Sequence, residues 1–166
     1  MKIHFIIINF LMVSHLQAQQ KTFLDWVNQN AITIEDSNPN SKLINFAIKT
    51  PEKFSNAQFF GFGEATHHGK EFFDIKAKFF KHLVENQNVR IFIMEESYQA
   101  ELGINEWISG GKGDRKTIAD NFSINPWYCK EVVDLLEWMR NYNLNKPKEE
   151  QIRFYGIDCQ IGKNIN

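Results

Sequence analysis

The stretch Gln58-Phe-Phe-Gly-Phe-Gly-Glu-Ala-Thr-His-His68 decides how this sequence is interpreted. Apolar residues run up to Gly61-Phe62-Gly63, and an acid and two histidines follow at once. In α/β proteins, ligands bind in the crevice at the carboxyl ends of the strands. A buried strand that ends at glycines, with polar residues between it and the next helix, borders that crevice. The stretch therefore predicts a strand from Ala57 to Phe62 with a functional site at its carboxyl end.

Two further apolar runs also end on an acid. They are Val89 to Glu95 and Ile152 to Asp158, which predict a second strand at Val89 to Met94 and a third at Ile152 to Ile157. A helix predicted from Lys70 to Gln87 separates the first two strands, as in a parallel pair joined by a right-handed crossover. More helices are expected at Tyr98–Ile108, capped by Ser97, at Arg115–Phe122 and at Trp127–Leu144. The predicted fold class is α/β, a mostly parallel sheet with flanking helices.

The composition indicates one globular domain. The chain has 166 residues, of which 43% are hydrophobic, enough to bury a core. The net charge is −1 and there is no basic cluster, so nucleic acid is not an expected partner. A small-molecule substrate is the expected partner instead.

The first 18 residues have the pattern of a secretory signal peptide. Met1-Lys2 is followed by an apolar run from Ile3 to Val13, and Leu16-Gln17-Ala18 offers a cleavage site after Ala18. The apolar run is too short to span a bilayer, so no membrane contact is expected after cleavage. The alternative is a buried N-terminal helix. With a signal peptide, the mature protein would be periplasmic or secreted.

The two cysteines, Cys129 and Cys159, could pair in an oxidising compartment. Neither has a histidine or cysteine neighbour at zinc-binding spacing. Both are therefore interpreted as structural residues.

Glu64 and His67 are three residues apart at the predicted corner between strand and helix. If the turn is helical, that spacing places both side chains on one face. A carboxylate beside an imidazole fixes its tautomer and increases its basicity, as a general base acting on water requires. The alternative is that His67 only caps a turn.

Lys76 lies where a helical wheel expects an apolar side chain. With 100° per residue, it falls in the middle of the arc formed by Phe72, Phe79 and neighbouring apolar residues, whereas Lys78 falls on the charged arc. A lysine that faces a sheet needs an acidic partner, and Glu64 and Glu95 are available. The alternative is that the Lys76 side chain extends to the surface.

A metal ion or a cofactor has weaker support. Glu64, His67, Glu95 and Asp158 could converge at the ends of the strands, but the metalloprotease pattern His-Glu-x-x-His is absent. Gly61-x-Gly63 lacks the third glycine of a dinucleotide-binding motif, because Thr66 stands in its place. No cofactor is expected, and metal-dependent hydrolysis remains an alternative.

Four blocks of the sequence resemble the erythromycin esterase family. They are Gly63-Glu-Ala-Thr-His67 with Lys70-Glu-Phe-Phe73, then Phe92-Ile-Met-Glu95, then the segment Glu131 to Asn143, and finally Arg153-Phe-Tyr-Gly-Ile-Asp-Cys-Gln160. The resemblance implies an α/β domain that hydrolyses esters with histidine-activated water, macrolide lactone opening being the family's known activity. It also implies that residues 19–166 form only the N-terminal part of a longer domain. Family members draw a further catalytic histidine from a part of the domain that follows this length.

By position, the resemblance makes His67 the general base, with Glu64 and Glu95 as its carboxylate partners and Lys76 as a basic catalytic residue. Trp127 and Asp158 are candidates for substrate contacts. The main alternative is a catalytically inactive fragment or binding module.

Overall fold

The computed structural model describes residues 21–123 and 125–159, so the predicted signal peptide lies outside the described residues. The chain divides into two compact units, Met1–Ile34 and Glu35–Asn166. In the first unit, residues 21–30 are helical. Phe23 and Trp26, two apolar residues of this helix, are exposed.

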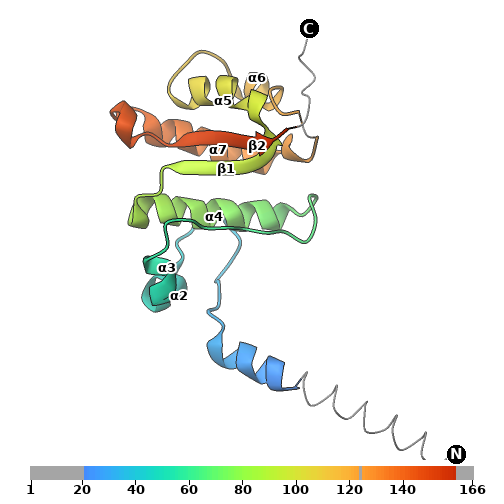
Figure 1. Ribbon diagram of the computed structural model, residues 1–166, viewed down its shortest axis with the longest axis vertical. Coiled ribbons are helices and arrows are strands. Elements are labelled where there is room, and N and C mark those ends of the chain that lie inside the picture. Colours follow the sequence, from blue (N-terminus) through green and yellow to red (C-terminus); the bar gives the residue numbers. More distant parts are fainter. Residues whose placement is uncertain (1–20, 124, 160–166) are drawn as a thin grey trace, which may run out of the picture. The chain divides into compact units, whose positions relative to one another are not determined.

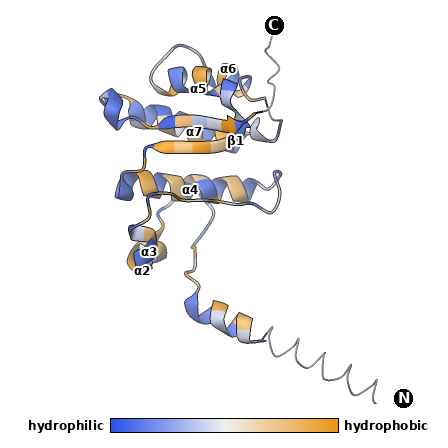
Figure 2. Cartoon of the chain, viewed as in Figure 1, coloured by the Kyte–Doolittle hydropathy of each residue, from blue (hydrophilic) through white to orange (hydrophobic). Residues whose placement is uncertain are grey.

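The sheet of the second unit has two parallel strands, β1 (Ile91–Ser97) and β2 (Arg153–Asp158), which lie side by side in Figure 1. The register pairs Phe92 with Phe154 and Met94 with Gly156. The predicted second and third strands are therefore confirmed, with bounds shifted by one to three residues. Figure 2 shows β1 as a strongly apolar strand between more mixed helices.

Gly156 allows the close approach of the two strands. A Cβ atom at this position would lie 2.3 Å from the carbonyl oxygen of Ser97 and 2.7 Å from that of Glu96. The register also shifts between Met94 and Ser97, which marks a bulge at the end of β1. Only glycine fits where the bulged backbone of β1 crosses so close to β2.

The rest of the second unit consists mainly of helices. They are α2 (Ile44–Lys49), α3 (Glu52–Ser55), α4 (Lys70–Gln87), α5 (Glu101–Ile108), α6 (Arg115–Ala119) and α7 (Lys130–Asn143), with 3-10 turns η1 (Tyr98–Ala100), η2 (Asn125–Trp127) and η3 (Lys148–Glu150). The bounds of α4 match the prediction, and the Ser97 hydroxyl caps η1 by accepting a hydrogen bond from the Gln99 amide. The helix predicted from Trp127 begins only at Lys130, because Asn125-Pro126-Trp127 forms a separate 3-10 turn. Within the part of the chain that the structure describes, none of the helices combines the length and the hydrophobicity that a membrane span requires.

The core lies where α4, α5 and α7 meet the inner face of the sheet. Its fully buried members include Ile104, Leu136, Met139, Ile152 and Phe154. Phe154 stacks near Phe92 and Phe122, so that aromatic rings join the sheet to the segment after α6. Burial of these side chains is the main force that holds the unit together.

The side chains of two asparagines make hydrogen bonds with the backbone of residues 152 and 154 that a neighbouring strand would otherwise make. The Asn105 side chain of α5 donates to the Phe154 carbonyl at 2.7 Å and accepts from the Phe154 amide at 2.8 Å. Asn143, which is buried at the end of α7, bonds both the carbonyl and the amide of Ile152. The outer edge of β2 is thereby satisfied by α5, since a buried backbone group needs a partner.

The prediction of a first strand at Ala57 to Phe62 is wrong for this structure. These residues form a loop that runs along α4 in Figure 1, and the sheet of the described chain contains only β1 and β2. The reason is spatial: a cavity lined by residues 57–64 and by Val89 to Glu95 separates the loop from β1. The loop therefore has no strand within hydrogen-bonding reach.

The placement of Lys78 on a solvent-exposed arc is also wrong. Only 2% of Lys78 is exposed, because its ammonium group donates to the Asp36 carbonyl at 2.8 Å, to the Asp36 carboxylate at 3.0 Å and to the Ser41 hydroxyl at 2.8 Å. Asp74, one helical turn before Lys78, is also buried and pairs with Lys70. The loop at residues 36–41 covers this side of α4, and a helical wheel of α4 alone does not contain that loop.

Candidate active site

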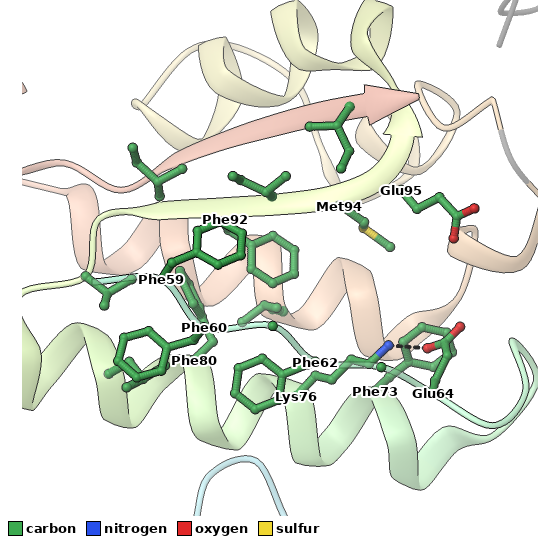
Figure 3. Close-up of a pocket in the computed structure, with 18 of the residues that line it drawn as sticks. Phe59, Phe60, Phe62, Glu64, Phe73, Lys76, Phe80, Phe92, Met94 and Glu95 are labelled. Atoms are coloured by element: carbon green, nitrogen blue, oxygen red, sulfur yellow. Dashed lines mark hydrogen bonds and ion pairs between the residues drawn. The ribbon is translucent and has the colours of Figure 1, made fainter. Parts of the chain in front are cut away.

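Glu64 bridges His67 and Lys76. One carboxylate oxygen of Glu64 contacts Nδ1 of His67, and the other accepts a hydrogen bond from Nζ of Lys76, the dashed line in Figure 3. The exposed fraction of the side chain is 10% for Glu64, 22% for Lys76 and 49% for His67. Of the two acids predicted as partners of Lys76, Glu64 and Glu95, the structure pairs it with Glu64.

Local structure brings these three groups together. Glu64 and His67 lie in the short segment that precedes α4, and Lys76 lies on the second turn of that helix. Burial opposes ionisation of Glu64, but the contacts with Lys76 and His67 outweigh it, so the pKa of Glu64 lies below its usual value. Glu64 is thus an anion that two cationic or proton-donating groups share.

With Nδ1 of His67 directed at Glu64, Nε2 is the ring nitrogen left for a water molecule or a substrate. The ring of His67 also packs edge-to-face against Trp127, with 5.1 Å between ring centroids. Contacts on two sides therefore define the orientation of the imidazole. This is the arrangement that a general base needs, because its proton-accepting nitrogen must point in a fixed direction.

Trp127 connects the imidazole to the end of β1. Its indole Nε1 donates to the carbonyl oxygen of Glu95 at 2.6 Å, and its ring meets Phe73 of α4 edge-to-face at 5.9 Å. Trp127 is only 3% exposed, although it forms part of the cavity wall. Because it is buried and bonded on several sides, Trp127 is better suited to hold His67 and β1 in place than to contact a substrate directly.

The two acids at the end of β1 have different environments. Glu95 is exposed and lines the cavity with Glu64, His67 and Lys76, and Figure 3 shows its carboxylate on the same side as Glu64. Glu96 is fully buried and accepts hydrogen bonds from the amides of Ser97 at 2.6 Å and Ser123 at 3.1 Å. Strand alternation accounts for this opposite placement.

Ser123 is a residue that the sequence interpretation did not single out. Its hydroxyl also donates to Glu96 and so holds the segment before η2 against β1. The only sequence signal for such a partner is the second acid of Glu95-Glu96, which alternation directs into the core.

The cavity beside these residues has a volume of about 910 Å³. Its polar end is formed by Glu64, His67, Lys76 and Glu95, and its remaining wall is largely aromatic and aliphatic, as Figure 3 shows for Phe59, Phe60, Phe80 and Phe92. A volume near the upper end of the range for small-molecule sites, with a few convergent polar groups, is typical of a ligand-binding cleft. The charged cluster therefore faces an apolar compartment.

Asp158 does not line this cavity, although its neighbour Ile157 does. It lies opposite Ser97 in the register of β1 and β2. Among the residues that the structure describes, no three histidine, cysteine or acidic side chains are grouped as ligands for a metal ion. The structure thus brings together Glu64, His67, Lys76, Glu95 and Trp127 but not Asp158.

The two cysteines are free thiols in the structure. Cys129 precedes α7, and burial raises the pKa of its thiol. A thiol whose pKa is raised holds less of the reactive thiolate form. Cys129 therefore has the properties of a structural residue.

The fold and the site define an α/β protein with a carboxylate, a histidine and a lysine joined at the start of a helix, beside a parallel sheet. The chain belongs to the erythromycin esterase family: the model of that family, described as erythromycin esterase, matches residues 84–166. The predicted family and fold class are confirmed.

Individual proteins agree with this assignment. The chain is 28% identical over 137 residues to an Escherichia coli protein named erythromycin esterase type II, which covers 82% of this chain and 31% of that protein. Two solved structures share the fold. One is a Bacillus cereus protein, 26% identical with a TM-score of 0.68 over 83% of this chain and 33% of its own length. The other, a succinoglycan biosynthesis protein, is 29% identical with a TM-score of 0.72 over 84% and 34%. The chain spans about a third of the length of these relatives.

Proposed function

We propose that this site hydrolyses an ester bond with a water molecule activated by His67. The observation that carries the proposal is the Glu64 carboxylate, which contacts Nδ1 of His67 with one oxygen and Nζ of Lys76 with the other. In this arrangement the proton of the imidazole sits on Nδ1 and Nε2 is free to accept a proton from water. The activated water then attacks the ester carbonyl.

Each charged group has a role in the proposed reaction. When His67 takes the proton, the Glu64 anion stabilises the imidazolium that forms, as the carboxylate does in other histidine-dependent hydrolases. Lys76 keeps Glu64 ionised in a partly buried position and supplies positive charge near the developing oxyanion. Glu95, on the same cavity wall, is a second acceptor that can orient the water.

The substrate in this proposal is an uncharged ester or lactone with a large apolar part. The cavity wall beyond the charged end is mostly apolar, so it favours a hydrophobic group and disfavours a charged one. The name of the Escherichia coli relative makes the macrolide lactone of erythromycin the first compound to test.

The proposal includes export of the chain. The charged start and apolar run of residues 1–18 support cleavage after Ala18 and a periplasmic or secreted mature protein. An esterase in that compartment meets its substrate before the substrate enters the cytoplasm.

The test is hydrolysis of erythromycin and of 4-nitrophenyl acetate by the purified chain, followed by mass spectrometry and absorbance. We expect turnover that His67→Ala reduces by about 10²–10⁴-fold, the usual contribution of a general base. His68→Ala, which alters the adjacent imidazole, is the matched control and leaves the rate within about twofold. Unchanged turnover in His67→Ala with an intact circular dichroism spectrum would refute the role of His67.

Two controls separate this proposal from its alternatives. Loss of turnover in a chelator, restored by added Zn²⁺, would indicate metal-dependent hydrolysis instead. No turnover of either ester by the folded chain, with binding of erythromycin retained, would indicate a binding module.

A further inference from the structure

One edge of β1 has no partner strand within the described part of the chain. The amide of Arg153 donates to the carbonyl of Arg90 at 2.8 Å, so the backbone groups of Arg90 point toward β2. Because successive residues of a strand alternate in direction, those of Phe92 and Met94 also point toward β2, and those of Ile91, Ile93 and Glu95 point away. The indole of Trp127 takes the Glu95 carbonyl, which leaves Ile91 and Ile93 as the open part of the edge.

An elongated space lies next to this edge. We call it the β1 trough: the part of the 910 Å³ cavity between residues 57–63 and Val89 to Glu95, with α4 as its floor. Six residue steps of about 3.3 Å, from Val89 to Glu95, give the trough a length of roughly 20 Å. A strand in a packed sheet occupies about 4.8 Å by 10 Å, or roughly 48 Å². A strand of that length fills about 960 Å³, which is close to the volume of the whole 910 Å³ cavity, so the trough has room for one strand at most.

The surfaces around the trough are apolar and incompletely covered. Phe60, Leu83 and Phe92 line it, and Figure 3 shows Phe92 and Phe60 directed into the space between β1 and α4. Ile91 is 52% exposed and Ile93 is 43% exposed on the other face of the strand, and both also border the cavity. An exposed apolar strand edge is a site where another strand pairs.

The comparisons indicate where such a strand comes from. About two thirds of the length of each matched relative lies outside the part that this chain covers. In the described part of this chain the sheet has two strands, and residues 57–63 border the same cavity as β1 without pairing with either strand. One strand in the trough would connect β1 to residues 57–63 and make one continuous sheet.

We propose that the β1 trough binds one β-strand from the part of the erythromycin esterase polypeptide that lies beyond the matched third. The strand pairs with the backbone groups of Ile91 and Ile93 on one side and with residues 57–63 on the other, and its inward side chains fill the space beside Phe92. Its end lies next to Glu64 and His67, so it adds side chains to the candidate active site. The inference rests on family membership and edge geometry, and ester hydrolysis is not required for it.

Amide hydrogen exchange of the purified chain tests the proposal. Overlapping 12-residue peptides that cover the Escherichia coli relative outside its aligned region are added one at a time, and exchange is followed by NMR. We expect one window, rich in apolar residues, to slow exchange of the Ile91 and Ile93 amides at least tenfold. The amides of Phe92 and Met94, which already bond β2, serve as internal references and change less than twofold.

Two variants of this experiment identify the interaction as strand pairing. The active window, N-methylated at alternate residues, keeps its apolar side chains but loses backbone donors, and we expect it to protect neither amide. Ile93→Pro removes a donor from the open edge only, since the ladder to β2 uses Phe92 and Met94, and an edge strand tolerates proline there. Ile93→Val is its matched control and keeps binding.

Three results would overturn the proposal. In the first, no window slows exchange of Ile91 and Ile93. In the second, the N-methylated peptide protects as well as the parent, which would indicate an apolar ligand and not a strand. In the third, sedimentation velocity shows a dimer of the chain that Ile93→Pro dissociates, which would make a second copy the occupant.

Discussion

The indole Nε1 of Trp127 donates a hydrogen bond to the carbonyl oxygen of Glu95 over 2.6 Å, while the same ring packs edge-to-face on His67. One buried side chain therefore ties the end of β1 to the imidazole of the candidate base. The bond uses a carbonyl on the strand edge that β2 does not reach. Movement of the 3-10 turn η2, which carries Trp127, would thus displace both Glu95 and His67.

Trp127→Phe is expected to separate the two contacts. Phenylalanine keeps an aromatic ring against His67 but loses the bond to Glu95, which lowers the free energy of unfolding by about 0.5–1.5 kcal/mol. Trp127→Leu also loses the edge-to-face contact with His67. It is expected to have a lower kcat than Trp127→Phe at unchanged KM, since His67 is less well oriented. Urea denaturation and ester kinetics of both variants check this, and a kcat equal to that of wild type in Trp127→Leu would contradict a positioning role.

Lys78→Met and Lys76→Met are expected to affect different properties. Lys78→Met should mainly lower stability, and Lys76→Met should mainly lower turnover. Lys78 is buried and donates to three oxygen atoms, so its loss is expected to lower the free energy of unfolding by about 1.5–3 kcal/mol without a direct effect on the site. Lys76 is partly exposed, so Lys76→Met is expected to cost less than about 1 kcal/mol but to cut turnover through Glu64. Exposed Lys112→Met is the control for both curves. A larger urea shift for Lys76→Met than for Lys78→Met would show the assignment to be wrong.

The stabilising effect of Glu64 is expected to depend on pH in the acidic range. Its pKa in the folded state lies below its usual value, because the contacts with Lys76 and His67 outweigh burial, so between the two pKa values the unfolded chain binds more protons than the folded chain. The contribution is therefore complete above about pH 4.5 and is lost as the pH falls through the folded pKa. Urea midpoints from pH 3 to pH 7 should show that wild type and Glu64→Gln differ most near neutrality and converge in acid. A constant difference across this range would argue against the ion pairs.

Gly156→Ala is expected to prevent normal pairing of β1 with β2. The new methyl group would meet two backbone carbonyl oxygens, at 2.3 Å and 2.7 Å, and backbone atoms cannot rotate away as a flexible side chain can. We expect a loss of more than about 3 kcal/mol, or no folded protein. Gly61→Ala is the control, because a Cβ there meets nothing within 4 Å, and its effect should be below about 1 kcal/mol. Thermal denaturation of both variants measures the difference.

Export is expected to remove residues 1–18. The basis is the short positive start, the apolar run and Leu16-Gln17-Ala18. Mass spectrometry of the exported protein should find Gln19 at the N-terminus. Leu16→Arg, which blocks the cleavage site, should leave the longer form, and an intact Met1 in exported wild type would contradict the prediction.

The sequence by itself determined the local features of this protein. The bounds of α4 follow from the periodicity of its apolar residues, because one face of a helix must be buried. The two strands follow from short apolar runs that end at acids, and the contact of Glu64 with His67 follows from their three-residue spacing in a turn. The partner of Lys76 could be narrowed to two acids, because a lysine in an apolar arc needs a counter-charge.

Tertiary structure decided the features that depend on segments far apart in the chain. Residues 57–62 have the composition of a strand, but strand formation requires a neighbouring backbone at about 4.8 Å, and a cavity lies there instead. Lys78 is buried because the loop at Asp36 and Ser41, some 40 positions earlier, folds over it. Trp127 supports His67 because α7 and its preceding turn pack beside α4. A pattern within one element predicts which face is apolar, whereas the partner of each face is chosen by the packing of all elements together.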